Sequence, residues 1–367
     1  MRCKKYFLII LTVKVFFTFF AVYIYQQFSQ LGDAERYLSA TLNTDDFFDR
    51  TRFTDNVFSV LIFIFSYKIV VNVFIACIFS FVFFSVLKDT FYLKYYKLAW
   101  LAFFLPSFQI WTSVAGKEVL AIMGFLLVIK YVVCLQLNVK CNILYLIVGG
   151  AVGVLLRPHY GLAYAYLLIS TIILARLKVG RISIGIYFFV LSVLSIMFII
   201  CISISIDLWS PYFTEAMKKA MKVIRSYFII TDAKASRENI EWGGVSDYLN
   251  NMYWGVAYSI IGPTLSEVIN RSVYMPFFIE GIISFALIII LVYKLYCSSR
   301  DFSFYRKFFY LSFLPSFVMI LMIHYPFGIF NPGAAIRYKQ NISPLIYFYP
   351  LLVLSYIEII KNSHHKR

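Results

Sequence analysis

The stretch YKIVVNVFIACIFSFVFFSVL, residues 67–87, decides the fold class of this chain. It is an almost unbroken apolar run of about 20 residues, the length that an α-helix needs to cross a bilayer. Similar runs make 61% of the 367 residues apolar and leave 14% charged, whereas a soluble domain has about 45–50% apolar and 25% charged residues. Within hydrocarbon every backbone polar group needs an internal partner, so continuous apolar runs predict helices. We therefore expect an all-α polytopic integral membrane protein.

Ten apolar runs predict about ten transmembrane helices. Their approximate boundaries are 6–26, 67–87, 98–114, 118–136, 142–157, 160–175, 182–207, 276–297, 308–324 and 342–360. The run at 57–66 is too short to cross alone, and we expect it either to extend the second helix or to lie at the interface. The first run ends in YIYQQFSQ without a small-residue cleavage site, which indicates an uncleaved anchor.

The positive charges predict the orientation of these spans. With the amino terminus inside, 16 of the 34 lysines and arginines lie on the inner side, in the segments 1–5, 88–97, 137–141, 176–181, 298–307 and 361–367. The first outer loop, 27–56, instead carries six acidic residues and three arginines. Cytoplasmic loops are enriched in lysine and arginine, so we expect both termini inside.

This topology divides the chain into N-terminal helices at 1–208, a large outer loop at 209–275 and C-terminal helices at 276–367. The net charge of +16 then mostly reflects orientation, so no nucleic-acid partner is expected. The chain has neither a Cys-x-x-Cys pair nor a nucleotide-binding glycine loop, so we expect no metal and no cofactor. The two halves show no internal repeat, which weakens a secondary-transporter hypothesis.

The large outer loop begins with a pattern typical of an interfacial helix. Met217, Met221, Ile224 and Phe228 recur at spacings of three and four, which places them on one helical face, with basic residues mostly on the other. Such a helix would gather an anionic lipid-linked substrate, or it would simply bind the head groups of ordinary lipids.

Four cations lie in short outer connections, where the orientation rule does not explain them. They are Lys117, Arg157, Arg337 and Lys339, and the last two flank Tyr338 in IFNPGAAIRYKQNISP (329–344). Fixed cations suit a phosphate group, and an aromatic ring suits stacking on a sugar. We expect these five residues to form a pocket for an anionic lipid head group, although any one cation would also fit a snorkelling anchor.

The outer connections also hold side chains suited to removing a proton from a sugar hydroxyl. These candidate bases are Glu118, His159, His324 and Asp33. Arg36, close to Asp33 in the first outer loop, is a further candidate for substrate binding. The alternative interpretations are an ordinary Lys117–Glu118 surface pair, structural histidines and a solvated acidic loop.

Three stretches together resemble one family. LPSFQIWTSVAGKE (105–118), LLRPHYG (155–161) and GAAIRYKQNISPLI (333–346) are similar to stretches of Wzy-type O-antigen polymerases, the oligosaccharide repeat unit polymerases of bacterial envelopes. The resemblance implies a GT-C-like glycosyltransferase of the bacterial inner membrane, active at its periplasmic face. Such an enzyme transfers a growing glycan from undecaprenyl pyrophosphate to a new lipid-linked repeat unit during lipopolysaccharide synthesis. It uses no cofactor, and a chain-length regulator protein in the membrane is a further implied partner.

Two other functions stay open on the sequence. One is a different GT-C glycosyltransferase that uses a polyprenyl-phosphate sugar, with Asp33 and Glu35 as its acidic pair. The other is a lipid-linked oligosaccharide flippase or another transporter, which predicts charges buried in mid-span.

Overall fold

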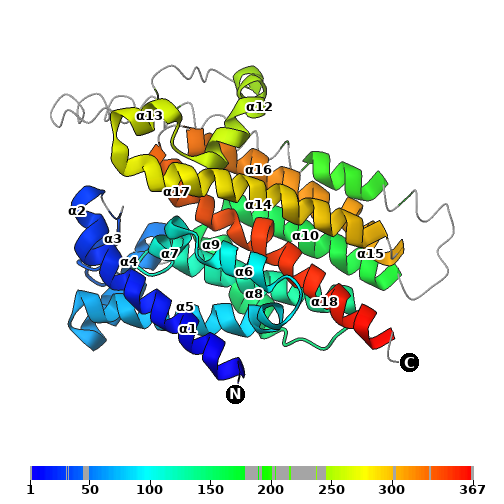
Figure 1. Ribbon diagram of the computed structural model, residues 1–367, viewed down its shortest axis with the longest axis horizontal. Helices are drawn as coiled ribbons and strands as arrows, with labels where there is room; N and C mark the ends of the chain where they lie inside the picture. Colours follow the sequence, from blue (N-terminus) through cyan, green and yellow to red (C-terminus); the bar gives the residue numbers. More distant parts are fainter. Residues whose placement is uncertain are drawn as a thin grey trace. The chain divides into compact units, whose positions relative to one another are not determined.

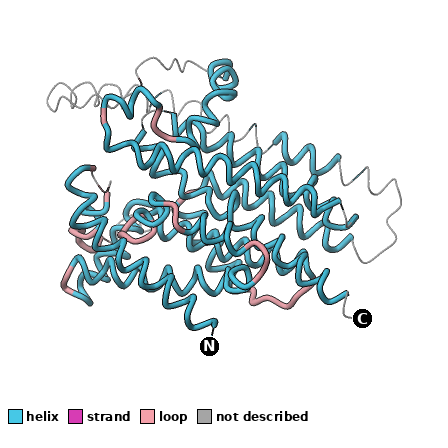
Figure 2. Tube along the Cα trace, viewed as in Figure 1, coloured by secondary structure: helices cyan, strands magenta, loops and turns pink. Residues whose placement is uncertain are grey.

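The computed structural model describes residues 2–29, 31, 33–43, 49–177, 189, 192–200, 203, 215, 237, 245–300, 303–329 and 332–364. All regular structure in these residues is helical, and no strand occurs among them (Figure 2). The expected all-α class is confirmed for this part of the chain. The expected span at 182–207 is helical over 192–200. Most of its remainder, and most of the amphipathic stretch of the large outer loop, lie outside the described residues.

Seven helical segments of the described chain are long and apolar enough to cross a membrane. They are Lys4–Phe28, Lys68–Tyr92, Lys117–Leu137, Pro158–Arg176, Ser272–Ser299, Tyr305–Ile329 and Pro344–Asn362. These helices support a multi-pass membrane protein. The expected number of ten spans, the inner position of both termini and the GT-C-like arrangement stay predictions.

The helices form two compact units. The first unit comprises Met1–Tyr164, Leu287–Arg306 and Gln340–Arg367, and the second comprises Ala165–Ala286 and Lys307–Lys339. Three helices continue from one unit into the other, namely α10 (Pro158–Leu177), α14 (Met275–Arg300) and α15 (Ser303–Phe308).

Figure 1 shows the helices of both units. The other helices of the first unit are α1 (Arg2–Phe20), α2 (Gln26–Phe28), α3 (Ala34–Tyr37), α4 (Arg50–Phe65), α5 (Lys68–Leu87), α6 (Tyr96–Phe103), α7 (Pro106–Trp111), α8 (Lys117–Leu137), α9 (Leu144–Leu156) and α18 (Tyr349–His364). Those of the second unit are α12 (Val245–Ile261), α13 (Leu265–Asn270), α16 (Leu314–Ile329) and α17 (Pro332–Tyr338).

The expected span at 98–114 is wrong, because this stretch is not one helix. α6 ends at Phe103, α7 begins at Pro106, and residues 112–116 are non-helical. Proline lacks an N–H and disfavours a helical residue before it, so it starts a new helix instead of continuing the old one.

Side chains of neighbouring helices satisfy the backbone of this broken stretch. The Thr18 hydroxyl donates to the Ser113 carbonyl at 3.1 Å, and the Ala115 N–H donates to Asn72 Oδ1 at 2.7 Å. Lys14, fully buried in α1, donates to the Thr112 hydroxyl. Non-helical backbone at membrane depth is tolerated when it is buried in protein, and these bonds explain how this segment meets that condition.

The run at 57–66 belongs to a separate helix, α4, so its expected fusion with the second helix is wrong. Ser66 takes a left-handed conformation with φ 62° and ends α4 before α5 begins at Lys68. The second alternative, a position at the membrane interface, stays a prediction.

α8 and α9 pack backbone to backbone in the first unit. A Cβ on Gly149 would lie 2.5 Å from the Gly124 carbonyl oxygen, and a Cβ on Gly153 would lie 2.6 Å from the Phe125 ring. Gly149 and Gly153 are four residues apart, the small-residue spacing that lets membrane helices approach closely. Arg157 follows after four more residues and so continues the same helical face. This glycine seam leads directly to the candidate site.

Candidate functional site

Arg157 and Glu118 form a buried ion pair at the end of the glycine seam. Arg157 Nη2 donates to Glu118 Oε1 at 2.5 Å, and the side chains are 11% and 2% exposed. A buried charge is costly unless it is paired and hydrogen-bonded, so each side chain compensates the buried charge of the other. The pair explains how two candidate residues that are distant in the sequence come to lie together.

The backbone holds both members of this pair rigidly. Arg157 is the single residue between α9 and α10: its N–H donates to the Gly153 carbonyl, and its carbonyl accepts from the Gly161 N–H. Glu118 lies in the first turn of α8. A Cβ added at Gly116 would lie 3.0 Å from Glu118 Oε2, so glycine leaves room for the carboxylate.

Lys117 lies beside this pair and is bound to the start of α4. Its Nζ donates to Thr51 Oγ1 at 2.6 Å. The charges of Arg157, Arg50 and Arg36 act on the Lys117 ammonium, and that of Asp33 opposes them. Among the described residues no carboxylate lies within ion-pair distance of Lys117.

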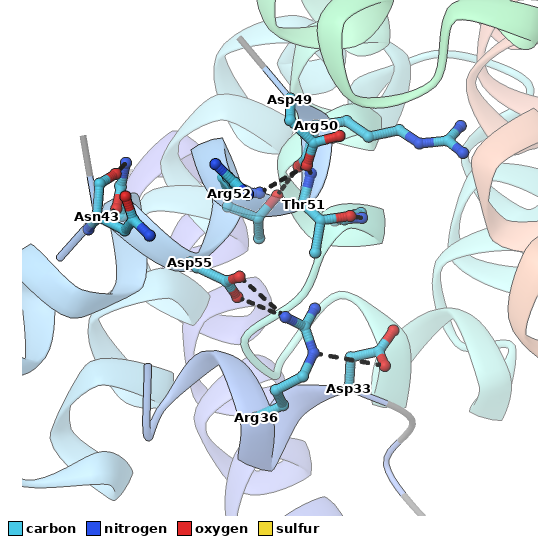
Figure 3. A network of polar contacts seen from close by, with 11 residues as sticks. Asp33, Arg36, Asn43, Asp49, Arg50, Thr51, Arg52 and Asp55 are labelled. Atoms are coloured by element: carbon cyan, nitrogen blue, oxygen red, sulfur yellow. Dashed lines mark hydrogen bonds and ion pairs between the residues drawn. The ribbon is translucent and has the colours of Figure 1, made fainter. Parts of the chain in front are cut away.

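The acidic candidate Asp33 belongs to a charged network in the segment 27–56 (Figure 3). Arg36 Nη1 contacts Asp55 Oδ1 at 2.8 Å and Oδ2 at 2.9 Å, and Arg36 Nε lies 3.8 Å from Asp33 Oδ1. Glu35 accepts from Lys68 at 2.8 Å. Arg36 is therefore bound to two carboxylates of the protein, and both acids of the proposed monophosphate-sugar alternative face a cation.

His159 lies in the first turn of α10, two residues after Arg157. It is buried, and its ring centre is 4.2 Å from that of Tyr160. The structure thus brings six of the predicted residues into the first unit, namely Asp33, Arg36, Lys117, Glu118, Arg157 and His159.

The other four candidates, His324, Arg337, Tyr338 and Lys339, belong to the second unit. Lys339 Nζ lies 3.1 Å from Glu280 Oε1, and these side chains are 2% and 1% exposed. His324 is fully buried, bonds to the Ser259 backbone and feels the charge of Lys339.

Arg337 and Tyr338 are partly buried at the end of α17. The Arg337 guanidinium lies 5.5 Å from the centre of the Tyr338 ring, a cation–π distance. The same ring is 5.7 Å from that of Phe327. Tyr338 is therefore already in contact with protein groups.

Three residues of these two units were not predicted as site residues from the sequence. Glu280 is the only acidic residue of the apolar helix α14, and an isolated acid in a span is a signal that could have found it. Arg50 was counted only as one of the charges of the first outer loop. Arg237 lies in the segment 209–275, where its neighbours in sequence are outside the described residues.

Arg237 joins the ends of three helices in the second unit. It donates to both oxygens of Glu267, at 2.8 and 2.9 Å, and to the carbonyls of Gly262 and Ile329, at 2.7 and 3.1 Å. Burial opposes the charge of Glu267, but the bonds from Arg237 and from Thr264 outweigh it and hold the pKa of Glu267 below its usual value. Carbonyls at helix ends need such donors, so Arg237 has a structural role.

No group of three or more His, Cys, Asp or Glu side chains in the described part of the chain is arranged to hold a metal ion. Comparison of the chain with known protein families, with curated proteins and with solved structures finds no match.

Proposed function

We propose that this chain is a membrane glycosyltransferase that polymerises lipid-linked oligosaccharide repeat units. It transfers the growing glycan from undecaprenyl pyrophosphate to a new lipid-linked unit at the periplasmic face of the bacterial inner membrane. The sequence resemblance to Wzy-type O-antigen polymerases suggests this reaction. The observation that carries the proposal is the placement of Lys117 next in sequence to the buried Arg157–Glu118 pair, at the junction of α8, α9 and α10.

The charges of this junction suit the departure of a pyrophosphate. Negative charge develops on the leaving group as the glycosidic bond breaks, and a fixed cation stabilises that charge. The half-buried Lys117 has N–H donors left after its bond to Thr51. The rigid backbone around Arg157 and Glu118 keeps the junction from rearranging, so little reorganisation is needed during the reaction.

Removal of the proton from the acceptor hydroxyl is assigned to a residue near this junction. Glu118 is bound to Arg157, so its main role is to pair with the arginine and not to remove a proton. His159 is two residues from Arg157 on α10, and Asp33 faces Arg36 at the first outer loop. His159 is therefore the better placed base. Asp33, like Glu118, lies against an arginine, and His324 belongs to the buried polar group of the second unit.

The test is the length of the surface glycan in a strain that lacks this gene and carries a variant on a plasmid. We expect deletion to leave single repeat units on the surface, and Lys117→Ala or Arg157→Ala to do the same. Arg271→Ala, at an exposed arginine of the second unit, is the control and keeps the ladder. A ladder of normal length in the deletion strain refutes the proposal.

One observation favours a transporter as the second candidate function. Glu280 lies in the apolar segment Ser272–Ser299 and forms a buried pair with Lys339, and intramembrane charges often mark transport pathways. A flippase delivers the lipid-linked unit to the outer face, so its deletion removes even the single unit. The same deletion strain therefore separates the two functions.

A further inference from the structure

Arg50 occupies an unusual position at the start of α4. Asp49 precedes it, and Asp49 Oδ1 accepts from the N–H groups of Thr51 at 2.8 Å and Arg52 at 3.0 Å. The guanidinium of Arg50 extends away from this cap and from the Arg36 network (Figure 3). Among the described residues it has neither an ion-pair partner nor a side-chain hydrogen bond.

Thr51 connects Arg50 to Lys117. The Thr51 hydroxyl accepts from Lys117 Nζ at 2.6 Å, and Arg50 is the preceding residue, with its charge acting on Lys117. An ammonium has three donors and a guanidinium has five. Thr51 uses one donor of Lys117. Among the described residues no donor of the Arg50 guanidinium is used, so both cations keep most of their donors free for a ligand.

Among the described residues, the carboxylates near these two cations also bind other groups. Asp55 is bound to Arg36 and Glu118 to Arg157. Asp49 caps α4, and these backbone bonds together with the Lys117 and Arg50 charges hold the pKa of Asp49 below its usual value. Asp33 lies 3.8 Å from Arg36 Nε, and its charge, like that of Asp49, also acts on Lys117. Like charges held close together repel, and a bound anion would relieve that repulsion.

We propose that Arg50 and Lys117 are the phosphate-binding residues of the first unit, and that Arg157 positions Glu118 instead of touching the phosphate. The ligand class is a phosphate or pyrophosphate group; its identity as a lipid pyrophosphate rests on the proposed function. The planar fork of arginine matches two phosphate oxygens, and lysine adds a point charge. The Thr51 hydroxyl, which accepts from Lys117 Nζ at 2.6 Å, holds the lysine at the start of α4.

The experiment measures binding to the full chain in lipid nanodiscs made of a neutral lipid. The probes are inorganic pyrophosphate and a short polyprenyl pyrophosphate. We expect Arg50→Gln and Lys117→Gln each to weaken both affinities about tenfold or more, as expected for the loss of a charge-assisted bond. Arg50→Lys retains part of the affinity. The matched controls are Lys68→Gln and Arg271→Gln, each of which removes one exposed cation.

Each outcome separates this site from its rivals. Unchanged affinity in folded Arg50→Gln and Lys117→Gln overturns the site, as does an equal loss in the two controls, which would indicate a general effect of surface charge. Equal affinity of wild type for both probes supports recognition of the phosphates alone, and tighter binding of the polyprenyl probe supports a lipid source. If the two variants lose binding and the deletion strain still makes a full glycan ladder, the anion site stands and the polymerase is refuted.

Discussion

Arg157 Nη2 and Glu118 Oε1 lie 2.5 Å apart, 39 residues apart in the chain, where the glycine seam of α8 and α9 ends. The contact depends on two features: the single-residue junction that fixes Arg157 and the close approach of the two helices. Both charges are buried, so the loss of either residue leaves the other as an unpaired buried charge.

The first prediction concerns this pair as a unit. Arg157→Ala and Glu118→Ala should each lower stability by about 3–5 kcal/mol, because each leaves a buried charge unpaired. The double variant Arg157→Met/Glu118→Leu should recover most of that loss. Thermal unfolding in detergent ranks the variants by their stability. Single variants that unfold at the wild-type temperature would show that the pair is exposed in the folded protein.

The second prediction concerns the glycine seam and has an internal control. Gly149→Ala and Gly124→Ala should lower the unfolding temperature, because the new Cβ would overlap a backbone oxygen of the facing helix at 2.5 and 2.7 Å. Gly150→Ala, on the same helix, meets nothing within 4 Å. It should be neutral or gain up to about 1 kcal/mol from helix propensity. Equal effects at Gly149 and Gly150 would contradict the seam.

The third prediction concerns the buried Lys14. Its Nζ lies 4.5 Å from the centre of the Phe79 ring and 4.8 Å from that of Phe108, and no carboxylate pairs with it in the described part of the chain. Lys14→Met keeps the volume and removes an expensive buried charge, so stability should be unchanged or higher. Lys14→Ala should lose about 2–5 kcal/mol by opening a cavity. If both variants lose stability equally in thermal unfolding, the ammonium itself is needed.

The fourth prediction is a pH dependence set by Glu267. Its pKa is lower in the folded protein than in the unfolded chain, whose value is about 4.3. The stabilisation is therefore fully present above the unfolded pKa and is lost as the pH falls through the folded pKa. We expect the unfolding temperature to fall below about pH 4 in the wild type and to fall less in Glu267→Gln.

The control for this pH dependence is Arg237→Ala. It removes the donor that lowers the pKa of Glu267, so it should reduce the acid-dependent loss and also lower stability at neutral pH. An acid-dependent loss of the wild-type size in Glu267→Gln would assign the effect to another carboxylate.

Some residues of the candidate site could be predicted from the sequence and others could not. Lys117 and Arg157 were found because a cation in a short outer connection breaks a local rule of charge distribution. Glu118 was found as a base, but its pairing with Arg157 was not, because the pairing depends on how two helices pack. Arg50 was not singled out among the charges of an acidic loop. The bond between Lys117 and Thr51, the residue after Arg50, is what connects it to the site.

The helical, membrane-embedded class was determined by the sequence alone, because burial of consecutive apolar residues is a local property that adds up along each run. Pro106 already carried the signal for the break between α6 and α7. Only the tertiary structure decided that residues 98–114 do not form one span, since the non-helical backbone after α7 is satisfied by Thr18 and Asn72 from other helices. The pairing of Lys339 with Glu280 was decided in the same way. Such contacts depend on distances across helices, and no local pattern of residues encodes those distances.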